Sequence, residues 1–225
     1  MKQDKAKALF IAHKVFAELV FDVQSLEGMP FTMPEVQTYL QGVTVGGHKV
    51  SDVEKLKQQK LGWELLIKMV KDGSFSLTKE TACAIQSVIG HGETLAPGQF
   101  RTGQVGIAGT EHKPPKASAL DAIFKHMIEE LSRLAHVREQ AYRLHLDFAR
   151  NQFFWDGNKR TGLLMLNGHL MSNGYAPLSI PAKRLHEYNA GMIRFYESGD
   201  YAEMMLFLRE CHDAMYERFD ESLTD

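Results

Sequence analysis

Apolar residues at helical spacing run through almost the whole chain, and no other feature constrains its fold as strongly. Between residues 4 and 22, Ala8, Ile11, Val15 and Leu19 follow one another at intervals of three or four positions. This period places apolar side chains along one face of an α-helix. Further helices are predicted in residues 32–40, 51–73, 77–89, 118–134, 139–151, 158–174 and 184–221. The chain is therefore predicted to be all-α.

Three of the predicted helices open with capping signals, and one of these is Ser118 with Asp121 three residues later. Thr32 is followed by Pro34 and Glu35, which places a hydroxyl cap, a tolerated proline and an acid at the start of one helix. Ser51, with Glu54 three residues later, has the sequence of a capping box at the start of the next helix. All three positions are predicted helix N-termini.

Residues 100–115 (FRTGQVGIAGTEHKPP) interrupt the helical pattern. Val105 and Ile107 alternate with glycines and polar residues, and the stretch ends in Pro114 and Pro115. Alternation over a short stretch bounded by glycine and proline is typical of a strand or hairpin. A small exposed β-hairpin is predicted here, on an otherwise α-helical domain.

The composition is that of an ordinary globular protein. The 225 residues include 44% apolar and 24% charged residues, enough for one compact domain with a sizeable core. A net charge of -2 provides no basic surface for nucleic acid, so no nucleic-acid partner is expected. Cys83 and Cys211 are too few for a disulfide framework. The first helix carries Lys, His and Glu and is neither a signal peptide nor a membrane span, so a cytoplasmic location without membrane contact is expected.

The stretch WDGNKR, which ends at Arg160, concentrates charge at the junction of two predicted helices. Backbone N–H groups at a helix start lack intrahelical partners and, with the helix dipole, attract anions such as phosphate. Gly157 lets the backbone approach a ligand closely, and Asn158 offers an amide. Lys159 and Arg160 supply positive charge. Asp156 would repel phosphate unless Mg²⁺ lay between them, which makes it the predicted metal ligand. Taken alone, the stretch fits a plain helix-linking turn equally well.

Longer segments around this stretch resemble the Fic family. LHLDFARNQFFWDGNKRTGLLMLNGHLMSNGYAPL is similar to the family's core motif, H-P-F-x-D/E-G-N-G-R-x-x-R, with its preceding L-H-x-x-F helix. SLEGMPFTMPEV and TVGGHKVSDVEKLKQQKLGWELL look like the amino-terminal region of members that carry their own inhibitory segment, and GQFRTGQVGIAGTEHKPP looks like the family's flap. The resemblance implies N-terminal helices with an inhibitory-type segment in residues 1–50 and one compact Fic domain in residues 51–225.

Most Fic proteins use Mg²⁺ and ATP, as substrate, to transfer AMP to a hydroxyl side chain of a target protein. Carried over by position, the resemblance implies that Asp156 organises the Mg²⁺. Asn158 and the backbone around Gly157 would hold the α-phosphate. Arg160 would neutralise the β-phosphate, with Lys159 beside it.

A protein that presents a Ser, Thr or Tyr hydroxyl is therefore the partner that the resemblance implies. The flap would hold this target in extended form by main-chain pairing. The flap residues are Val105, Gly106, Ile107, Ala108 and Gly109. The sequence also leaves a homo-oligomer open.

The first departure from the family motif is Gln152, which stands where the family has a histidine. That histidine takes the proton from the target hydroxyl, and a carboxamide cannot do so near neutral pH. Loss of a general base costs about 10²- to 10⁴-fold in rate. His145 lies two helical turns away, about 10.5 Å along the axis, so it cannot replace the missing base and is expected in the core. The catalytic candidates are Gln152, Asp156 and Arg160.

The second departure concerns Lys159 and Leu163, which replace the family's glycine and second arginine. Both changes resemble the Doc branch of the superfamily, which transfers a phosphate rather than AMP. Three functions follow from the motif as it stands. They are an adenylyltransferase impaired by Gln152, a nucleotide-binding regulatory pseudoenzyme, and a Doc-like protein phosphotransferase.

The inhibitory-type segment is altered as well. In the family, a Ser or Thr, three residues, Glu, and then Gly or Asn bring the glutamate against the second arginine. Here those positions are Val23, Glu27 and Gly28. Because Leu163 replaces that arginine, Glu27 is left with the cations of the WDGNKR stretch, and a weaker autoinhibition is predicted.

Overall fold

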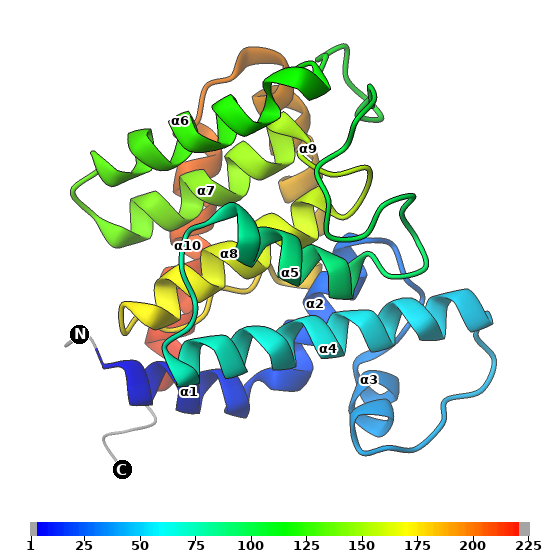
Figure 1. Cartoon of the computed structure of the whole chain (residues 1–225). Helices are drawn as coiled ribbons and strands as arrows, with labels where there is room; N and C mark the ends of the chain where they lie inside the picture. The colour runs from blue at the N-terminus through cyan, green and yellow to red at the C-terminus, as the bar shows by residue number, and fades with distance from the viewer. Residues whose placement is uncertain (1–3, 221–225) are drawn as a thin grey trace.

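Residues 4–220, the part of the chain that the computed structural model describes, fold into a bundle of ten α-helices with two short 3₁₀ helices (Figure 1). No strand occurs within that range. The prediction of an all-α fold is therefore confirmed. The described helices are all too short or too polar to cross a membrane.

The helices follow the apolar periods of the sequence. They are α1 (Lys5–Lys14), α2 (Phe16–Leu26), α3 (Met33–Leu40), α4 (Val50–Asp72), α5 (Lys79–Ile89), η1 (Ala117–Ala119), α6 (Leu120–Ser132), α7 (Val137–Asn151), α8 (Asn158–Ser172), η2 (Ala182–Arg184), α9 (Leu185–Ser198) and α10 (Ala202–Asp220).

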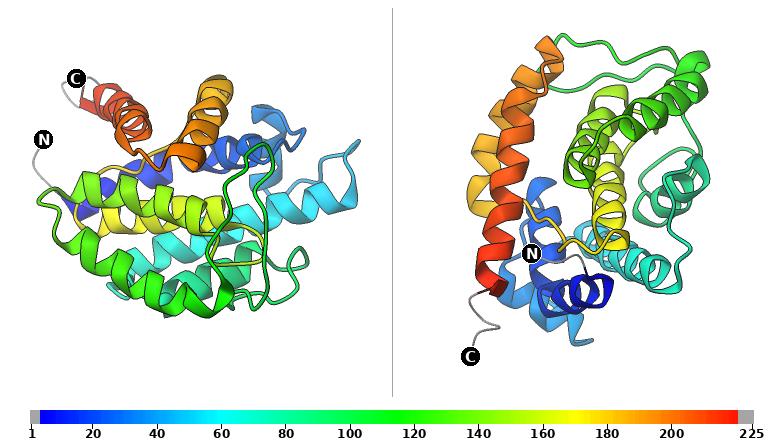
Figure 2. Two further views of the ribbon diagram at one scale, coloured as in Figure 1. Left: turned by 90° about the horizontal axis from the view of Figure 1, so that it is seen from above. Right: turned by 90° about the vertical axis from the view of Figure 1, so that its left-hand side faces the viewer.

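The α7–α8 pair forms the centre of the bundle (Figures 1 and 2). α8 is buried on almost every side, since α1, α4 and α5 also pack against it, while α6 and α10 pack on α7. Gly162 on α8 permits the close approach, because a Cβ atom there would lie 2.7 Å from the Cβ atom of Phe148 and 3.1 Å from the carbonyl oxygen of His145. Those atoms cannot move without shifting α7. The two helices α7 and α8 can therefore pack this closely only because residue 162 has no side chain.

The hydrophobic core extends from the first helix to the last. It includes Ala8 and Leu19 from the N-terminal helices and Met215 from α10. α2 packs against both α3 and α4, which ties the N-terminal helices to the rest of the bundle. The division of the chain at residue 50 stays a prediction.

Two of the predicted helical segments are each divided in two. Val15 leaves helical geometry, with φ −102° and ψ 15°, and separates α1 from α2. The last helical region breaks at Gly199, whose positive φ of 71° ends α9. The apolar period continues across both breaks, which is why the sequence pattern does not reveal them.

The three capping signals have different outcomes. The cap predicted at Ser118 is wrong, because Ser118 lies inside η1 and α6 begins at Leu120 with Ala119 as its N-cap and no side-chain cap. Thr32 forms the full capping box with Glu35, as its sequence predicts. The capping box predicted at Ser51 is wrong, because α4 begins at Val50 with Lys49 as its N-cap and no side-chain cap. Placing Ser51 inside the first turn removes its hydroxyl from the capping position.

The β-hairpin predicted at residues 100–115 is wrong. The segment crosses one end of the bundle as an irregular loop between α5 and α6, next to the α9–α10 pair (Figure 2). Within this fully described stretch, no backbone hydrogen bond joins the two legs of the loop. Pro114 and Pro115 have no N–H group to donate to a ladder. A side-chain bond joins the legs instead, since Gln104 Nε2 donates to the carbonyl oxygen of Pro114 at 2.8 Å.

Two buried histidines, His145 and His212, and the half-buried His169 make the fold sensitive to acid. Burial lowers the pKa of His145 and His212 to about 3 and the pKa of His169 to about 4. An unfolded histidine has a pKa of about 6.5, so at intermediate pH protons bind to the unfolded chain first. The stabilisation is complete above pH ~6.5 and is lost as the pH falls toward the folded pKa values. Acidification from pH 7 to pH 5 is expected to cost about 2 kcal/mol per histidine.

The His169→Gln variant isolates one of these contributions. The new amide can keep a hydrogen bond to Gln140 Oε1, which lies 2.7 Å from His169 Nε2, but it cannot titrate. In urea unfolding at pH 7 and pH 5, the variant should lose about 2 kcal/mol less stability on acidification than the parent chain. Equal losses in the two proteins would contradict this account.

Candidate functional site

The loop between α7 and α8 is a tight turn held by aromatic packing. Gln152 follows α7 in the left-handed region, with φ 51° and ψ 63°, and is the one non-glycine residue of the described chain with a positive φ. Phe153 and Phe154 are fully buried, and both rings pack against the ring of Phe100. A strained backbone position persists where its surroundings enforce it, and these buried rings do so here.

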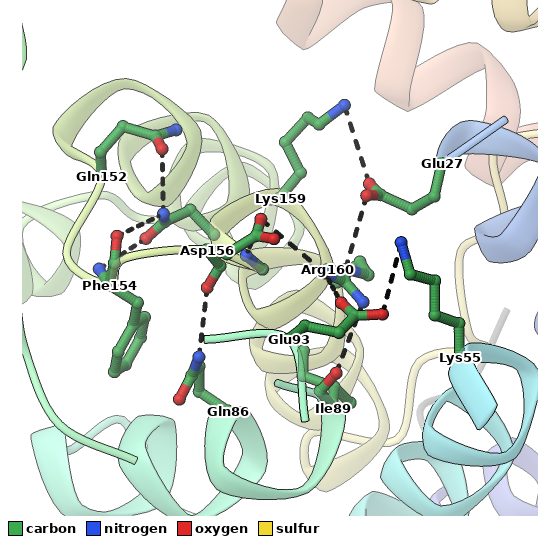
Figure 3. A network of polar contacts seen from close by, with 12 residues as sticks. Glu27, Lys55, Gln86, Ile89, Glu93, Gln152, Phe154, Asp156, Lys159 and Arg160 are labelled. Carbon is green, nitrogen blue, oxygen red and sulfur yellow. Dashed lines mark hydrogen bonds and ion pairs between the residues drawn. The ribbon is translucent and has the colours of Figure 1, made fainter. Parts of the chain in front are cut away.

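The carboxamide of Gln152 is engaged at both ends. Its Oε1 accepts a hydrogen bond from Asn158 Nδ2 at 2.9 Å (Figure 3). Its Nε2 donates to the carbonyl oxygen of Ala149 at 2.6 Å. Asn158 is itself buried and bonds to both backbone groups of Phe154. Gln152 and Asn158 therefore close the loop on itself. Because the side chain of Asn158 is bonded within the loop, only its backbone groups are available to an incoming ligand.

The start of α8 offers N–H groups to an anion. Gly157 is the N-cap, with φ 75°, and the first intrahelical bond runs from the N–H of Thr161 to the carbonyl of Gly157. The three N–H groups before Thr161 in α8 therefore have no intrahelical partner. Asp156 lies beside them, with its side chain 58% exposed and its Oδ1 accepting from the N–H of Gly157 at 2.6 Å. Gln86 of α5 donates to the carbonyl of Asp156 at 3.1 Å and braces the turn.

Arg160 is a buried cation surrounded by three carboxylates. Its side chain is 4% exposed, and its Nη2 lies 2.7 Å from Glu93 Oε2 and 3.8 Å from Asp156 Oδ1. Glu27 Oε2 lies 3.6 Å from its Nε (Figure 3). Burial lowers the pKa of Arg160, but Glu27 and Glu93 outweigh burial and raise the pKa above its ordinary value. The guanidinium is thus held charged by acids that come from other segments.

Two lysines complete an alternating network of charge. Lys159 Nζ lies 3.8 Å from Glu27 Oε1, and Lys55 Nζ on α4 lies 3.6 Å from Glu93 Oε1. Glu27 caps the end of α2, and Gly28 follows it with φ 68°, which turns the chain away. Glu27 therefore contacts both Lys159 and Arg160.

Leu163 occupies the position of the family's second arginine. Its side chain is 2% exposed and belongs to the hydrophobic core. A small enclosed cavity of about 10 Å³ lies beside it, lined also by Glu27, Lys159 and Tyr188. A space of this size holds at most one water molecule. Leu163 provides no charge for a ligand.

Glu93, Lys55 and Gln86 belong to the site but were not predicted. Glu93 lies in the loop after α5, at a place where the sequence GHGETLAPG marks only a boundary between helices. A surface loop acid and a buried ion-pair partner look alike in such a segment. Tertiary packing of α4 and α5 against α8 brings all three side chains to the start of α8.

The predicted flap residues lie in the loop 100–116. Ile107 packs partly against the core, whereas Gly106 and Ala108 on either side are exposed. Gly109 has φ 81°, and a Cβ atom there would lie 3.7 Å from Ile193 on α9. The in-and-out alternation is therefore present from Val105 to Ala108 but ends at the exposed Gly109, and it occurs in an unpaired loop.

His145 lies in the core, where the helical spacing places it. It is 1% exposed, and its Nε2 lies 2.9 Å from the hydroxyl of Tyr188. Burial lowers its pKa to about 3, so the ring is neutral at physiological pH. In residues 4–220 no group of three or more His, Cys, Asp or Glu side chains is arranged to hold a metal ion.

The sequence is similar to one family model and to several curated proteins. The model of the Fic/DOC family matches residues 76–170. Two relatives called protein adenylyltransferase Fic are similar over most of the chain. The one from Aedes aegypti is 25% identical over 219 residues, which are 92% of this chain and 42% of the relative. The one from Drosophila persimilis is 26% identical over 222 residues, with the same coverage of 92% and 42%. The chain thus spans about two fifths of the length of these relatives.

Solved structures share the fold. A Fic domain containing signaling protein from Bacteroides thetaiotaomicron aligns with a TM-score of 0.77 at 18% identity, over 96% of this chain and 88% of that one. Fic-1 from C. elegans aligns with a TM-score of 0.82 at 16% identity, over 96% of this chain and 66% of that one. At such identities the likeness concerns the arrangement of helices.

Proposed function

The chain belongs to the Fic/DOC family, and we propose that it binds a magnesium–ATP complex at the start of α8 and transfers AMP to a hydroxyl group of a protein. The observation that carries this proposal is the buried guanidinium of Arg160 next to unpartnered backbone N–H groups of α8. The name of the curated relatives, protein adenylyltransferase, supports the same activity.

The donor set at this helix start fits a magnesium-bound polyphosphate. Free N–H groups and the positive end of the helix dipole favour phosphate oxygens. Glu27 and Glu93 place carboxylate oxygens near Arg160, where phosphate oxygens could take over the same ion pairs. Asp156 is half exposed, and a cation bound there would share the carboxylate with the N–H of Gly157, which donates to its Oδ1. Bound Mg²⁺ would supply charge neutralisation between Asp156 and the phosphates, with one carboxylate being a common protein contribution.

The proposed transfer forms a bond between the target oxygen and the α-phosphorus and breaks the bond to the bridging oxygen of the β-phosphate. Pyrophosphate leaves with the electron pair of that bond, and the proton of the target hydroxyl must go to a base. Gln152 cannot accept it, so the proton would pass to water. The reaction is therefore proposed to be slow in this chain.

A nucleotide-binding protein without transfer is the second candidate. The engagement of both ends of the Gln152 carboxamide favours it, because the side chain then serves the loop rather than a substrate. A Doc-like phosphotransfer is the third candidate, supported by Lys159 and by the buried, uncharged Leu163.

Calorimetry with Mg·ATP tests the proposed binding. The parent chain should release heat that depends on magnesium, and Asp156→Ala and Arg160→Ala should each weaken binding at least about ten-fold, the loss typical of a charge-assisted contact. Arg133→Ala is the matched control, since Arg133 pairs with Glu130 on the surface of α6. Magnesium-independent heat, or no heat with any nucleoside phosphate, would rule the site out.

Parallel labelling separates the three candidates. The chain is incubated with a protein extract and ATP labelled at either the α- or the γ-phosphate. Slow α-label incorporation supports the adenylyltransferase, and γ-label alone supports the phosphotransferase. Binding of ATP without any label supports the second candidate.

A further inference from the structure

Arg101, at the start of the loop 100–116, is a buried cation without an acidic partner in the described part of the chain, residues 4–220. It is 2% exposed and is among the largest fully buried side chains of the protein. Burial alone accounts for the lowering of its pKa, and no carboxylate compensates for it. An uncompensated buried charge is costly unless hydrogen bonds satisfy it. Its hydrogen bonds therefore indicate what the residue does.

The guanidinium spans both legs of the loop and the end of α7. Its Nη1 donates to the carbonyl of Gly103 at 2.7 Å and its Nη2 to the carbonyl of Pro115 at 2.6 Å. Its Nε donates to the carbonyl of Gln152 at 2.6 Å, with Asn151 a longer partner of Nη2 at 3.4 Å. The planar fork of arginine suits such divergent acceptors, and lysine cannot reproduce it.

Other contacts to this part of the loop are few. The backbone N–H of Arg101 donates to the carbonyl of Phe153 at 2.9 Å. His112 Nε2 lies 3.2 Å from the carbonyl of Arg150, farther along the loop. The ring of Trp155 packs against Gly103, where a Cβ atom would lie only 2.6 Å from the indole. Since no backbone ladder joins the legs, Arg101 is the residue that joins both of them to the turn at Gln152.

We infer that Arg101 is a positioning residue for the protein substrate. It fixes the loop 100–116 relative to Gln152, so that a hydroxyl held by the loop arrives at the start of α8. Within residues 4–220 its side chain makes no hydrogen bond or ion pair with Asp156 or Arg160, so it acts on the target and not on the nucleotide. The inference rests on the proposed function for the identity of the substrate, but the anchoring itself does not.

Fluorescence of Trp155 reports the anchoring directly. The chain has two tryptophans, and Trp63 is 1% exposed, so acrylamide quenching is dominated by Trp155. Arg101→Met should raise the quenching constant at least about two-fold. The quenching constant of Arg101→Lys should lie between those of Arg101→Met and the parent chain, because an ammonium group can donate to fewer of the carbonyls that the guanidinium reaches. Arg133→Met, the same change at a surface arginine, should leave quenching unchanged.

Kinetics in the Gln152→His background test the positioning. Arg101 bonds to the backbone carbonyl of residue 152, so that substitution leaves its partner in place. Arg101→Met should raise KM for the protein target by about ten-fold, which corresponds to the loss of one or two charge-assisted hydrogen bonds. The affinity for Mg·ATP, measured by calorimetry, should stay within a factor of two.

The possible outcomes separate the two proposals. Unchanged quenching in both Arg101 variants overturns the inference, and so does loss of the folded state in both, which would make Arg101 a residue of the core alone. Equal weakening of target and nucleotide binding overturns it as well. If no variant binds Mg·ATP or labels protein, the proposed function fails and the positioning of a target fails with it, while quenching still decides whether Arg101 anchors the loop.

Discussion

The Gln152→His variant is expected to transfer AMP about 10²- to 10⁴-fold faster than the parent chain, because an imidazole at this position restores a general base. The backbone at residue 152 is held in the left-handed region by the buried rings of Phe153 and Phe154. The new side chain therefore starts from the same point of the turn. Initial rates of α-label incorporation at saturating Mg·ATP measure the effect.

Gln152→Asn is the matched control, since it keeps a carboxamide and adds no base. It should stay at the rate of the parent chain. The rate of the histidine variant should also rise with pH as the imidazole loses its proton, around pH ~6.5 for an unperturbed ring. Rates equal to the parent at every pH between about 6 and 9 would show that base catalysis is not what this chain lacks.

Glu93→Gln is expected to lower the free energy of unfolding by about 3 kcal/mol, because it breaks an ion pair whose two side chains are 4% and 11% exposed. The same variant should bind pyrophosphate about ten-fold more tightly, because the anion can take the place of the carboxylate that Arg160 has lost. Urea unfolding with and without pyrophosphate measures both effects, because a ligand of the folded state raises its stability.

Glu54→Gln is the control for this prediction. Glu54 lies 3.5 Å from Lys57 on the surface of α4, with both side chains at least half exposed, and such pairs contribute less than about 1 kcal/mol. Glu27→Gln should have a smaller effect than Glu93→Gln, because Glu27 lies 3.6 Å from Arg160 and makes no hydrogen bond to it. A Glu93→Gln variant as stable as the parent would show that Glu93 is not the main partner of Arg160.

The helices could be predicted from sequence because their evidence is local. An apolar period is set by neighbours three and four residues away, and it marks the outer helices, whereas α8 is buried on almost every side. N-caps are predicted less reliably, because a shift of one residue in the start of the helix changes which residue is the cap. Thr32 caps its helix as expected, whereas Ser51 lies one residue inside α4.

The candidate site could be predicted only where its residues are consecutive. The turn from Gln152 to Arg160 is visible in the sequence, because its glycine, acid and cations follow one another. Glu93 and Arg101 contact this turn from 67 and 51 positions away. Their roles depend on how α5 and the following loop pack against the turn, and the spacing of residues in the sequence does not predict such packing. The β-hairpin failed for a related reason, since alternation alone does not provide a partner strand.

The absent side chain at Gly162 makes the site intolerant of small errors. It sets how far apart α7 and α8 lie, because a Cβ atom at Gly162 would meet the Cβ atom of Phe148, and the ends of these two helices carry Gln152 and Asn158. Even one methyl group at this point would wedge the helices open and spread the two ends of the turn. The geometry of the turn between α7 and α8 thus depends on a buried contact at Gly162, one helical turn away from the start of α8.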